Sequence, residues 1–555
     1  MNTEGVKIRY GDVAPEAKEN FNPEATDKTS FSDLSQLQEY NLKFPNFANP
    51  CEYGAVLLDS SSEAFPLDTS AENIGLWSES VTGSDGAFTN PVTLTLTSEG
   101  QYSSQGITLT FDTYNSIFCN DLTITWYRNN SQIAAADFTP NSAFYFCWNK
   151  VENFNKLTIT FKKLNMPHNR LKLRAIDYGY GTFFDSKELR NVGAIQELNP
   201  ISTEISINTV DFTLDSKSDM EYSFQSKQPL EVYFNGELRA VTFVSKSQRQ
   251  SKTIWKVESE DYIGQLSKLT FMGGMYSDKN AKDLLTDIFT QAKIPFSISS
   301  DLEQKTVSGH ISICDCREAV RQICFAIGAV CSTADSDKVN IYTISSAIKD
   351  TVPLSRIRQG QSFDEEDRVT AVSISAHNYK QISESVDAYK AIDSGTGDNI
   401  MVTFSEPLHD LAISGGQILK SSANYAVIKA NSGCVLTGKK YEDITTVYTK
   451  VNPVVSASDL ENIIEITDAM LVNNSNAEII LSKVYDYLIK RNTTKLTINE
   501  GYSYTDSGDV VFDSVVKPGD IITAETEYLG TVTGRITSER FNLNGRILVK
   551  ECEMI

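Results

Sequence analysis

Residues 433–440, GCVLTGKK, have most of the spacing of a phosphate-binding loop. In such a loop, backbone amides and a lysine hold the phosphates, and a Ser or Thr after the lysine binds magnesium. Here Lys440 occupies the position after Lys439, and no helix-forming run follows that could direct its N-terminus at a phosphate. A surface hairpin therefore explains this segment better than a nucleotide site.

Four cysteines at short spacing, Cys314, Cys316, Cys324 and Cys331, could supply thiolates to zinc. Cys314 and Cys316 are closer together than the ligands of a metal knuckle, and Cys324 and Cys331 lie in an apolar run. We therefore expect small buried apolar residues. The nine cysteines are odd in number and scattered, so we also expect free thiols and synthesis in a reducing cytosol.

The histidines and carboxylates show no arrangement typical of a catalytic site. No histidine lies in an HExxH motif, and the chain has no GxSxG motif. Glu231, Glu258, Glu260 and Asp261 could contribute to a glycosidase pair, but a solvated acidic face explains them more simply. We predict no catalytic residue, no cofactor and no metal, and hence a non-enzymatic protein. The four histidines are His168, His310, His377 and His409.

Three aromatic residues, Trp77, Tyr127 and Trp148, are candidate glycan contacts, because sugar-binding β-sandwiches stack pyranose rings on exposed aromatic side chains. Trp126 shares a face with the apolar residues of its predicted strand, so Tyr127 should point outward. Trp77 and Trp148 are expected at strand ends or loops, where a ligand could reach them. Packing inside the protein remains the alternative for each.

Length and charge limit the classes of protein. At ~150 residues per domain, 555 residues predict three to four domains. Lys+Arg 50 against Asp+Glu 72 gives −22, without a basic block, which argues against a groove that grips nucleic acid. The N-terminus has no apolar signal region, and the longest apolar run, 323–331, is far shorter than the ~20 residues of a membrane span. We expect neither secretion nor a membrane span.

The hydrophobic pattern predicts a mainly β, multidomain fold with a small α+β domain. Strict alternation in the first part of the chain predicts a β-sandwich. Helical periodicity follows around 281–289 and 319–327, with a strand at 339–342, and a later helix at 477–488. The alternating strands are 92–97, 107–111, 122–126 and 157–161, and turns are predicted at 235–236, 517–520 and 544–545.

These elements predict six segments along the chain. The first is an extended arm with a short helix around 34–42, and the second is the sandwich. Four segments of β, α+β, β and β character follow. Their predicted bounds are 1–50, 51–184, 185–275, 276–350, 351–455 and 456–555.

The chain from 185 to 555 resembles the tail hub proteins of bacteriophages and related injection machines. The resemblance rests on turn and hydrophobic patterns in the first barrel, the small α+β domain and the closing β domain, and these patterns are not catalytic signatures. They are QPLEVYFNG (228–236), AKDLLTDIFTQAKIP (281–295), CREAVRQICFAIG (316–328), VNIY (339–342), KPGDII (517–522), GTVTGRI (530–536) and FNLNG (541–545).

The sandwich resembles the galactose-binding-like jelly rolls inserted in tail proteins of phages that infect Gram-positive bacteria. GLWS (75–78) and RLKLRAIDYG (170–179) carry this resemblance. Leu76 stands where a second Trp is often found beside the position of Trp77, a departure that weakens the transfer of sugar binding. The chain stops at Ile555 directly after the last β domain, so we expect no lytic domain.

The resemblance implies a structural tail-tip or baseplate hub. Its partners would be two further copies in a homotrimeric ring, the tail tube and distal tail proteins, tape-measure or tip proteins, and host cell-surface glycan. DNA would pass through an acidic lumen without specific binding. The protein would belong to the virion tail, assembled in the host bacterial cytoplasm. The alternative is a secreted carbohydrate-binding or glycan-degrading multimodular protein, which the missing signal region disfavours.

Overall fold

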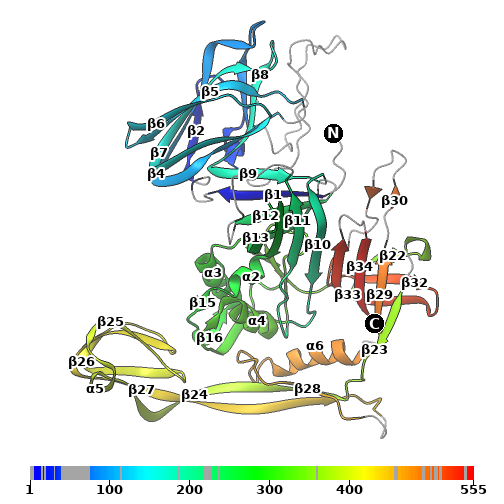
Figure 1. The fold of residues 1–555 in the computed structure, drawn as a ribbon. Helices are drawn as coiled ribbons and strands as arrows, with labels where there is room; N and C mark the ends of the chain where they lie inside the picture. The colour runs from blue at the N-terminus through cyan, green and yellow to red at the C-terminus, as the bar shows by residue number, and fades with distance from the viewer. Residues whose placement is uncertain are drawn as a thin grey trace. The chain divides into compact units, whose positions relative to one another are not determined.

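The computed structural model of the chain forms two compact units. Unit 1 comprises Met1–Lys187 with Glu221–Glu231, and unit 2 comprises Glu188–Met220 with Val232–Ile555. Strands dominate both units, which confirms the predicted mainly β, multidomain fold class (Figure 1). The structure describes residues 6–13, 17, 20–29, 32–38, 75–112, 115–185, 187–216, 224, 228–234, 237–357, 361–455, 460–490, 494–500, 503–504, 510–511, 516–542 and 547–554.

The main sheet of unit 1 has the strand order β3-β8-β4-β7-β5-β6, with β2 paired to β4. All four segments predicted from alternation lie in strands of this sheet: the first two in β4, the third in β5 and the fourth in β7. The bounds are β2 Asn22–Ala25, β3 Leu76–Val81, β4 Ala87–Phe111, β5 Cys119–Arg128, β6 Ser131–Phe138, β7 Phe144–Leu164 and β8 Arg170–Asp177.

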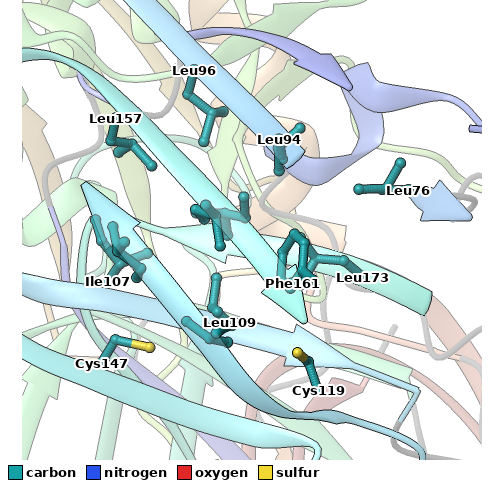
Figure 2. Close-up of a cluster of buried hydrophobic side chains, with 14 of the residues drawn as sticks. Leu76, Leu94, Leu96, Ile107, Leu109, Cys119, Cys147, Leu157, Phe161 and Leu173 are labelled. Carbon is teal, nitrogen blue, oxygen red and sulfur yellow. The ribbon is translucent and has the colours of Figure 1, made fainter. Parts of the chain in front are cut away.

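The core of unit 1 is built from the alternate apolar residues of these strands (Figure 2). In the antiparallel β4–β7 ladder, Leu94 lies opposite Ile159 and Leu96 lies opposite Leu157. All four side chains are fully buried. Because each such side chain contributes roughly 1.5–3 kcal/mol on burial, the period-two pattern supplies much of the stability of this unit.

The described residues of the segment expected to be an extended arm pack into unit 1. Val6, Ile8 and Tyr10 are buried in β1, which pairs antiparallel with β9, and β2 pairs with β4. The short helix expected near 34–42 is a 3₁₀ helix, η1, whose Leu37 is fully buried; 39–42 lie outside the described residues. The bounds are β1 Val6–Val13, η1 Leu34–Gln38 and β9 Gly179–Phe184.

Unit 2 contains the predicted small α+β element. Asn280 begins α3 by accepting hydrogen bonds from the amides of Lys282 and Asp283, and Asp315 begins α4 by accepting from the Glu318 amide. Gly328, at φ +67°, ends α4. Both predicted helices and the predicted strand are confirmed. The bounds are α2 Tyr262–Leu266, β15 Thr270–Phe271, β16 Gly274–Asn280, α3 Ala281–Ala292, β17 Phe296–Ile298, β18 Thr306–Ile311, β19 Cys314–Asp315, α4 Cys316–Ile327, β20 Val330–Ser332 and β21 Val339–Tyr342.

The strands before and after this element join in one sheet of unit 2. Its order is β23-β29-β34-β33-β10-β11-β14-β13, with β32 paired to β33 and β22 paired to β32. The predicted turn at 517–520 is confirmed, because the Asp520 amide donates to the Lys517 carbonyl at 3.0 Å. The turns predicted at 235–236 and 544–545 lie outside the described residues. The bounds are β10 Leu189–Glu197, β11 Thr209–Asp215, β12 Pro229–Phe234, β13 Glu237–Arg249, β14 Ile254–Glu260, β22 Ile348–Val352, η2 Leu354–Arg356, β23 Ser362–Glu365, β29 Thr494–Glu500, β32 Ile521–Thr526, β33 Gly530–Asn542 and β34 Ile547–Met554; the short β30 Ser503–Tyr504 pairs separately with β31 Val510–Val511.

A second sheet of unit 2 is dominated by two long strands, β24 and β27, which run side by side (Figure 1). Helix α6 packs on both strands through apolar residues that include Ile480, Leu481 and Val484. This helix confirms the periodicity predicted from Ala477 onward. The bounds are β24 Ala371–Lys390, α5 Ala391–Ser394, β25 Gly397–Thr403, β26 Leu408–Ser421, β27 Tyr425–Val451, β28 Ile463–Ile466 and α6 Ala477–Lys490.

Candidate functional site

Trp77 lies in β3, and its side chain packs inside unit 1. It is only 2% exposed, and the ammonium of Lys172 lies 5.4 Å from its ring centroid. Ser32 fixes the Trp77 backbone, because its hydroxyl accepts from the Trp77 amide at 2.9 Å and donates to the Trp77 carbonyl. A ring covered in this way has no free face for a sugar, so the packing alternative describes Trp77 in this structure.

Tyr127 and Trp148 remain the accessible aromatic residues of the predicted set. Trp126 is fully buried and Tyr127 is partly exposed, as the alternation predicts, with Lys156 placed 5.2 Å from the Tyr127 ring centroid. Trp148 lies within β7, not at a strand end, and is 50% exposed beside Phe146.

The three aromatic candidates do not converge on one site. Tyr127 lies opposite Lys156 in the β5–β7 ladder, whereas Trp148 lies opposite Gly106 in the β4–β7 ladder. The two β7 positions are eight residues apart along the chain, and Asn153, at φ +56°, interrupts the extended backbone between them.

The phosphate-loop-like segment 433–440 lies inside β27. Val435 pairs with Ser414 and Lys439 pairs with His409 on β26, while Val435 and Lys439 also pair with β24. The expectation of a surface hairpin is wrong here, because strands on both sides pair with this stretch. Gly433, at φ +76°, permits the irregular backbone between Ala430 and Val435. No helix follows, so the segment lacks the geometry of a phosphate site.

The cysteine quartet is arranged as small core residues. Cys316, Cys324 and Cys331 are buried and Cys314 is partly buried, as predicted, and all four are free thiols. Burial raises the pKa of Cys316 to about 11, which keeps this thiol protonated at neutral pH. In the described part of the chain, no group of three or more His, Cys, Asp or Glu side chains could hold a metal ion.

Two histidines of unit 2 lie beside Tyr379. The His310 ring is 5.6 Å and the His377 ring 6.5 Å from that of Tyr379. His377 Nδ1 is 2.7 Å from Asp443, and His310 Nε2 is 2.6 Å from the Asn424 side-chain oxygen. Burial lowers the pKa of His310. These contacts join β18 to the β24–β27 sheet, which is a structural role for both rings.

Two of the acids expected on a solvated face are buried instead. Asp261 is 1% and Glu231 is 6% exposed, so the expectation is wrong for both. Asp261 caps α2 by accepting from the Gly264 amide, and it also accepts from the Thr333 hydroxyl. Burial raises the pKa of Asp261 to about 6. The sequence carries no local signal for the contact between Asp261 and Thr333, because the two residues are far apart along the chain.

Unit 1 holds two buried ionic contacts that the sequence analysis missed. Arg9 lies between Asp177 and Glu231, with N–O distances of 3.0 Å to each. Lys172 Nζ lies 3.1 Å from Asp112, and both side chains are fully buried. Because the partners come from distant strands, sequence spacing could not reveal either contact.

An apolar cavity of about 370 Å³ lies in unit 2 between α4, α6 and the segment around Ile344. Phe325, Ile480 and Val484 line its wall, with Lys483 and Arg535 among its polar residues. The Arg535 guanidinium donates to the backbone carbonyls of Ser345 and Gly519, so its hydrogen bonds stabilise the nearby backbone.

Among the described residues, no helix has both the length and the apolarity needed to cross a membrane.

Comparison with solved structures finds similar chains among tail proteins. A tail protein from Neisseria meningitidis MC58 is 13% identical, with a TM-score of 0.40, over 66% of this chain and 95% of its own. The 43 kDa tail protein of prophage MuSo2 from Shewanella oneidensis is 10% identical, with a TM-score of 0.40, over 67% and 94%. Prophage tail protein gp18 from Listeria monocytogenes EGD-e is 9% identical, with a TM-score of 0.38, over 67% and 91%. No family model and no curated protein matches the sequence. Likenesses of this size carry no conclusion about activity or partners.

Proposed function

We propose that the chain is a structural, non-enzymatic component of a phage-type tail, acting as a tail-tip or baseplate hub. The observation that carries this is the organisation of unit 2. Strand β10 pairs with β33, so strands from before and after the α+β element share one sheet. A hub of the kind that the sequence resembles has the same order of parts: a first barrel, a small α+β domain and a closing β domain.

In this proposal three copies form a ring between the tail tube and the tip, within a virion tail assembled in the host cytoplasm. Closed symmetric assembly would cover sheet edges that a single chain leaves exposed. The formal net charge of −22 supports passage of DNA, because an acidic lumen repels phosphates and keeps them from binding. Partners would be the tail tube, distal tail proteins, and tape-measure or tip proteins.

Mass measurement tests the proposal directly. Light scattering coupled to size exclusion should give three times 61.6 kDa for the full chain alone, or a complex that contains three copies of the chain when tail-tube protein is added. Electron microscopy of that peak should show rings. A chain that stays at 61.6 kDa both alone and with tube protein would contradict the hub assignment.

A second candidate function, glycan recognition by unit 1, rests on Trp148. Its 50% exposure on a β-sandwich leaves part of the ring accessible to a pyranose. Quenching of tryptophan fluorescence by cell-wall glycan should be lost in Trp148→Ala if this surface binds sugar. Trp77→Phe is the matched control, because Trp77 is buried. Equal quenching in wild type and Trp148→Ala would contradict glycan recognition at Trp148.

A further inference from the structure

The outer part of β27, residues 441–451, has one open edge. On one side β24 pairs along its whole length, from Tyr441 opposite Gln381 to Val451 opposite Ala371. On the other side β26 pairs only as far as Lys440, which lies opposite Leu408. In the part of the chain that the structure describes, no strand pairs with this side of 441–451. Alternate residues along this stretch of about eleven therefore present unpaired backbone N–H and C=O groups to a partner.

This open edge also carries exposed apolar side chains. Ile444 is 48%, Val447 is 62% and Val451 is 66% exposed. The stretch 444–449, ITTVYT, contains no charge, glycine or proline, which is the composition that favours strand pairing. On the neighbouring helix α6, Ile479 is 61% exposed and lies three residues before Ser482, whose hydroxyl contacts Lys450 at 2.8 Å. Apolar surface thus gathers along the edge.

The charges at the two ends of the edge are complementary to each other. Glu442 and Asp443 lie at one end and Lys450 lies at the other. If a second copy of 441–451 pairs antiparallel about Thr446, Glu442 of each copy faces Lys450 of the other. Ile444 then faces Tyr448, and Thr445 faces Val447, so apolar and β-branched residues meet across the strands.

Other arrangements of the same two strands are disfavoured. Parallel in-register pairing places Glu442 against Glu442 and Lys450 against Lys450, which is repulsive. An antiparallel slip of two residues in one direction places Lys450 opposite Lys440, and in the other direction places Lys450 opposite Ile444. The charge pattern therefore favours the register about Thr446 over these three alternatives, and in that register the edge is complementary to itself.

We propose that this edge of β27 is a two-fold interface at which two copies of the chain join their β24–β27 sheets into one continuous sheet. The contact is isologous, so each copy contributes the same residues. It goes beyond the proposed hub function, because a threefold ring does not generate a two-fold contact. A single strand pair buries little area, so association depends on protein concentration.

Disulfide trapping tests the register. Thr446 faces its own copy across the two-fold axis, where opposite Cα atoms are about 4.5–5.5 Å apart, within reach of a disulfide. Full-length Thr446→Cys should therefore form covalent dimers on mild oxidation. Thr449→Cys is the matched control, because its two copies would lie roughly 20 Å apart. Wild type measures the background of the native cysteines.

Charge exchange tests the specificity. Lys450→Glu should weaken association by about tenfold, because the introduced carboxylate would face Glu442 in both symmetric pairs. The double variant Glu442→Lys with Lys450→Glu restores both pairs and should restore association. Ser482→Ala removes the hydrogen bond from Lys450 but leaves Lys450 5.4 Å from the Tyr485 ring centroid and the edge charge unchanged, so its association should match wild type. Circular dichroism checks that each variant folds.

The outcomes separate this interface from the hub proposal. A mass of six copies of the chain supports both the hub and the two-fold interface. A mass of two copies supports the interface alone. A mass that stays at three copies at high concentration, with no Thr446→Cys dimer, overturns the interface and leaves the hub. Equal cross-linking of Thr446→Cys and Thr449→Cys, or failure of the double charge variant to associate while folded, also overturns the interface.

Discussion

In unit 1 the buried carboxylates of Asp112 and Asp177 contact Lys172 and Arg9, whereas in unit 2 the buried carboxylate of Asp261 accepts hydrogen bonds from an amide and a hydroxyl. An ion pair removed from water is stable only while both charges are present. Burial of a carboxylate without a cation instead raises its pKa, although hydrogen bonds from neutral donors oppose that rise, so the group takes up a proton at a higher pH. Removing the cation of Arg9 or Lys172 should therefore destabilise unit 1, whereas removing the carboxylate charge of Asp261 should stabilise unit 2.

The largest expected effect is at Arg9. Arg9→Met leaves Asp177 and Glu231 buried without their shared cation, and unit 1 should lose about 5 kcal/mol of unfolding free energy. Urea unfolding of the full chain checks this. Three of the four tryptophans lie in unit 1, so a Trp255→Phe background isolates their fluorescence. Adding Asp177→Asn and Glu231→Gln should recover part of the loss; no recovery would mean that charge is not the cause.

Lys172 should show the next largest effect. Lys172→Met keeps the length of the side chain but leaves Asp112 charged and fully buried, at an expected cost of about 3–5 kcal/mol in the same urea assay. The double variant with Asp112→Asn removes both charges and should cost clearly less. If the single and double variants lose equal stability, packing against Trp77 would be the dominant contribution of Lys172.

Removing the charge of Asp261 should increase stability, in contrast to the two substitutions in unit 1. Its pKa is about 6 in the folded chain against 3.8 for an ordinary Asp, so the folded state holds the proton more tightly. The contribution of Asp261 to the unfolding free energy is present below about pH 4 and is lost as the pH rises through 6. The loss is about 3 kcal/mol, at 1.36 kcal/mol per pKa unit. Asp261→Asn should remove that loss and stabilise unit 2 at pH 8, measured as the difference between wild type and Asp261→Asn in urea unfolding at pH 4, 6 and 8.

A matched variant separates charge from capping at Asp261. Asp261→Ala also removes the hydrogen bonds to Gly264 and Thr333, so it should be less stable than Asp261→Asn at every pH. A wild-type stability that does not change between pH 4 and pH 8 would contradict the protonated carboxylate.

The smallest effect on stability is expected at Trp148. Because half of its surface is exposed, Trp148→Ala should change the stability of unit 1 by less than about 0.5 kcal/mol. Trp126→Ala, at a fully buried position of the same sheet, should cost about 3–5 kcal/mol. A large loss for Trp148→Ala would show that it packs in the unit and does not serve as a contact surface for a ligand.

Local patterns predicted the elements well. The alternation that predicted β4, β5 and β7 and the periodicity that predicted α3, α4 and α6 are both consequences of short-range geometry, with apolar residues facing one core. The burial of Cys324 and Cys331 was also predicted correctly, because both lie in an apolar run of the sequence. The glycan role of Tyr127 and Trp148 and the hub role stay predictions.

The sequence by itself determined the alternating strands of unit 1 and the helices α3, α4 and α6, since side-chain direction repeats every ~2 residues in a strand and every ~3.6 in a helix. Only the tertiary structure decided that Trp77 is covered by Lys172, that Glu231 and Asp261 are buried, and that 433–440 lie inside a long strand. The open edge of 441–451 is likewise visible only in the tertiary structure. The physical reason is that burial, ion pairing and strand order depend on residues far apart along the chain, whose approach no local pattern encodes.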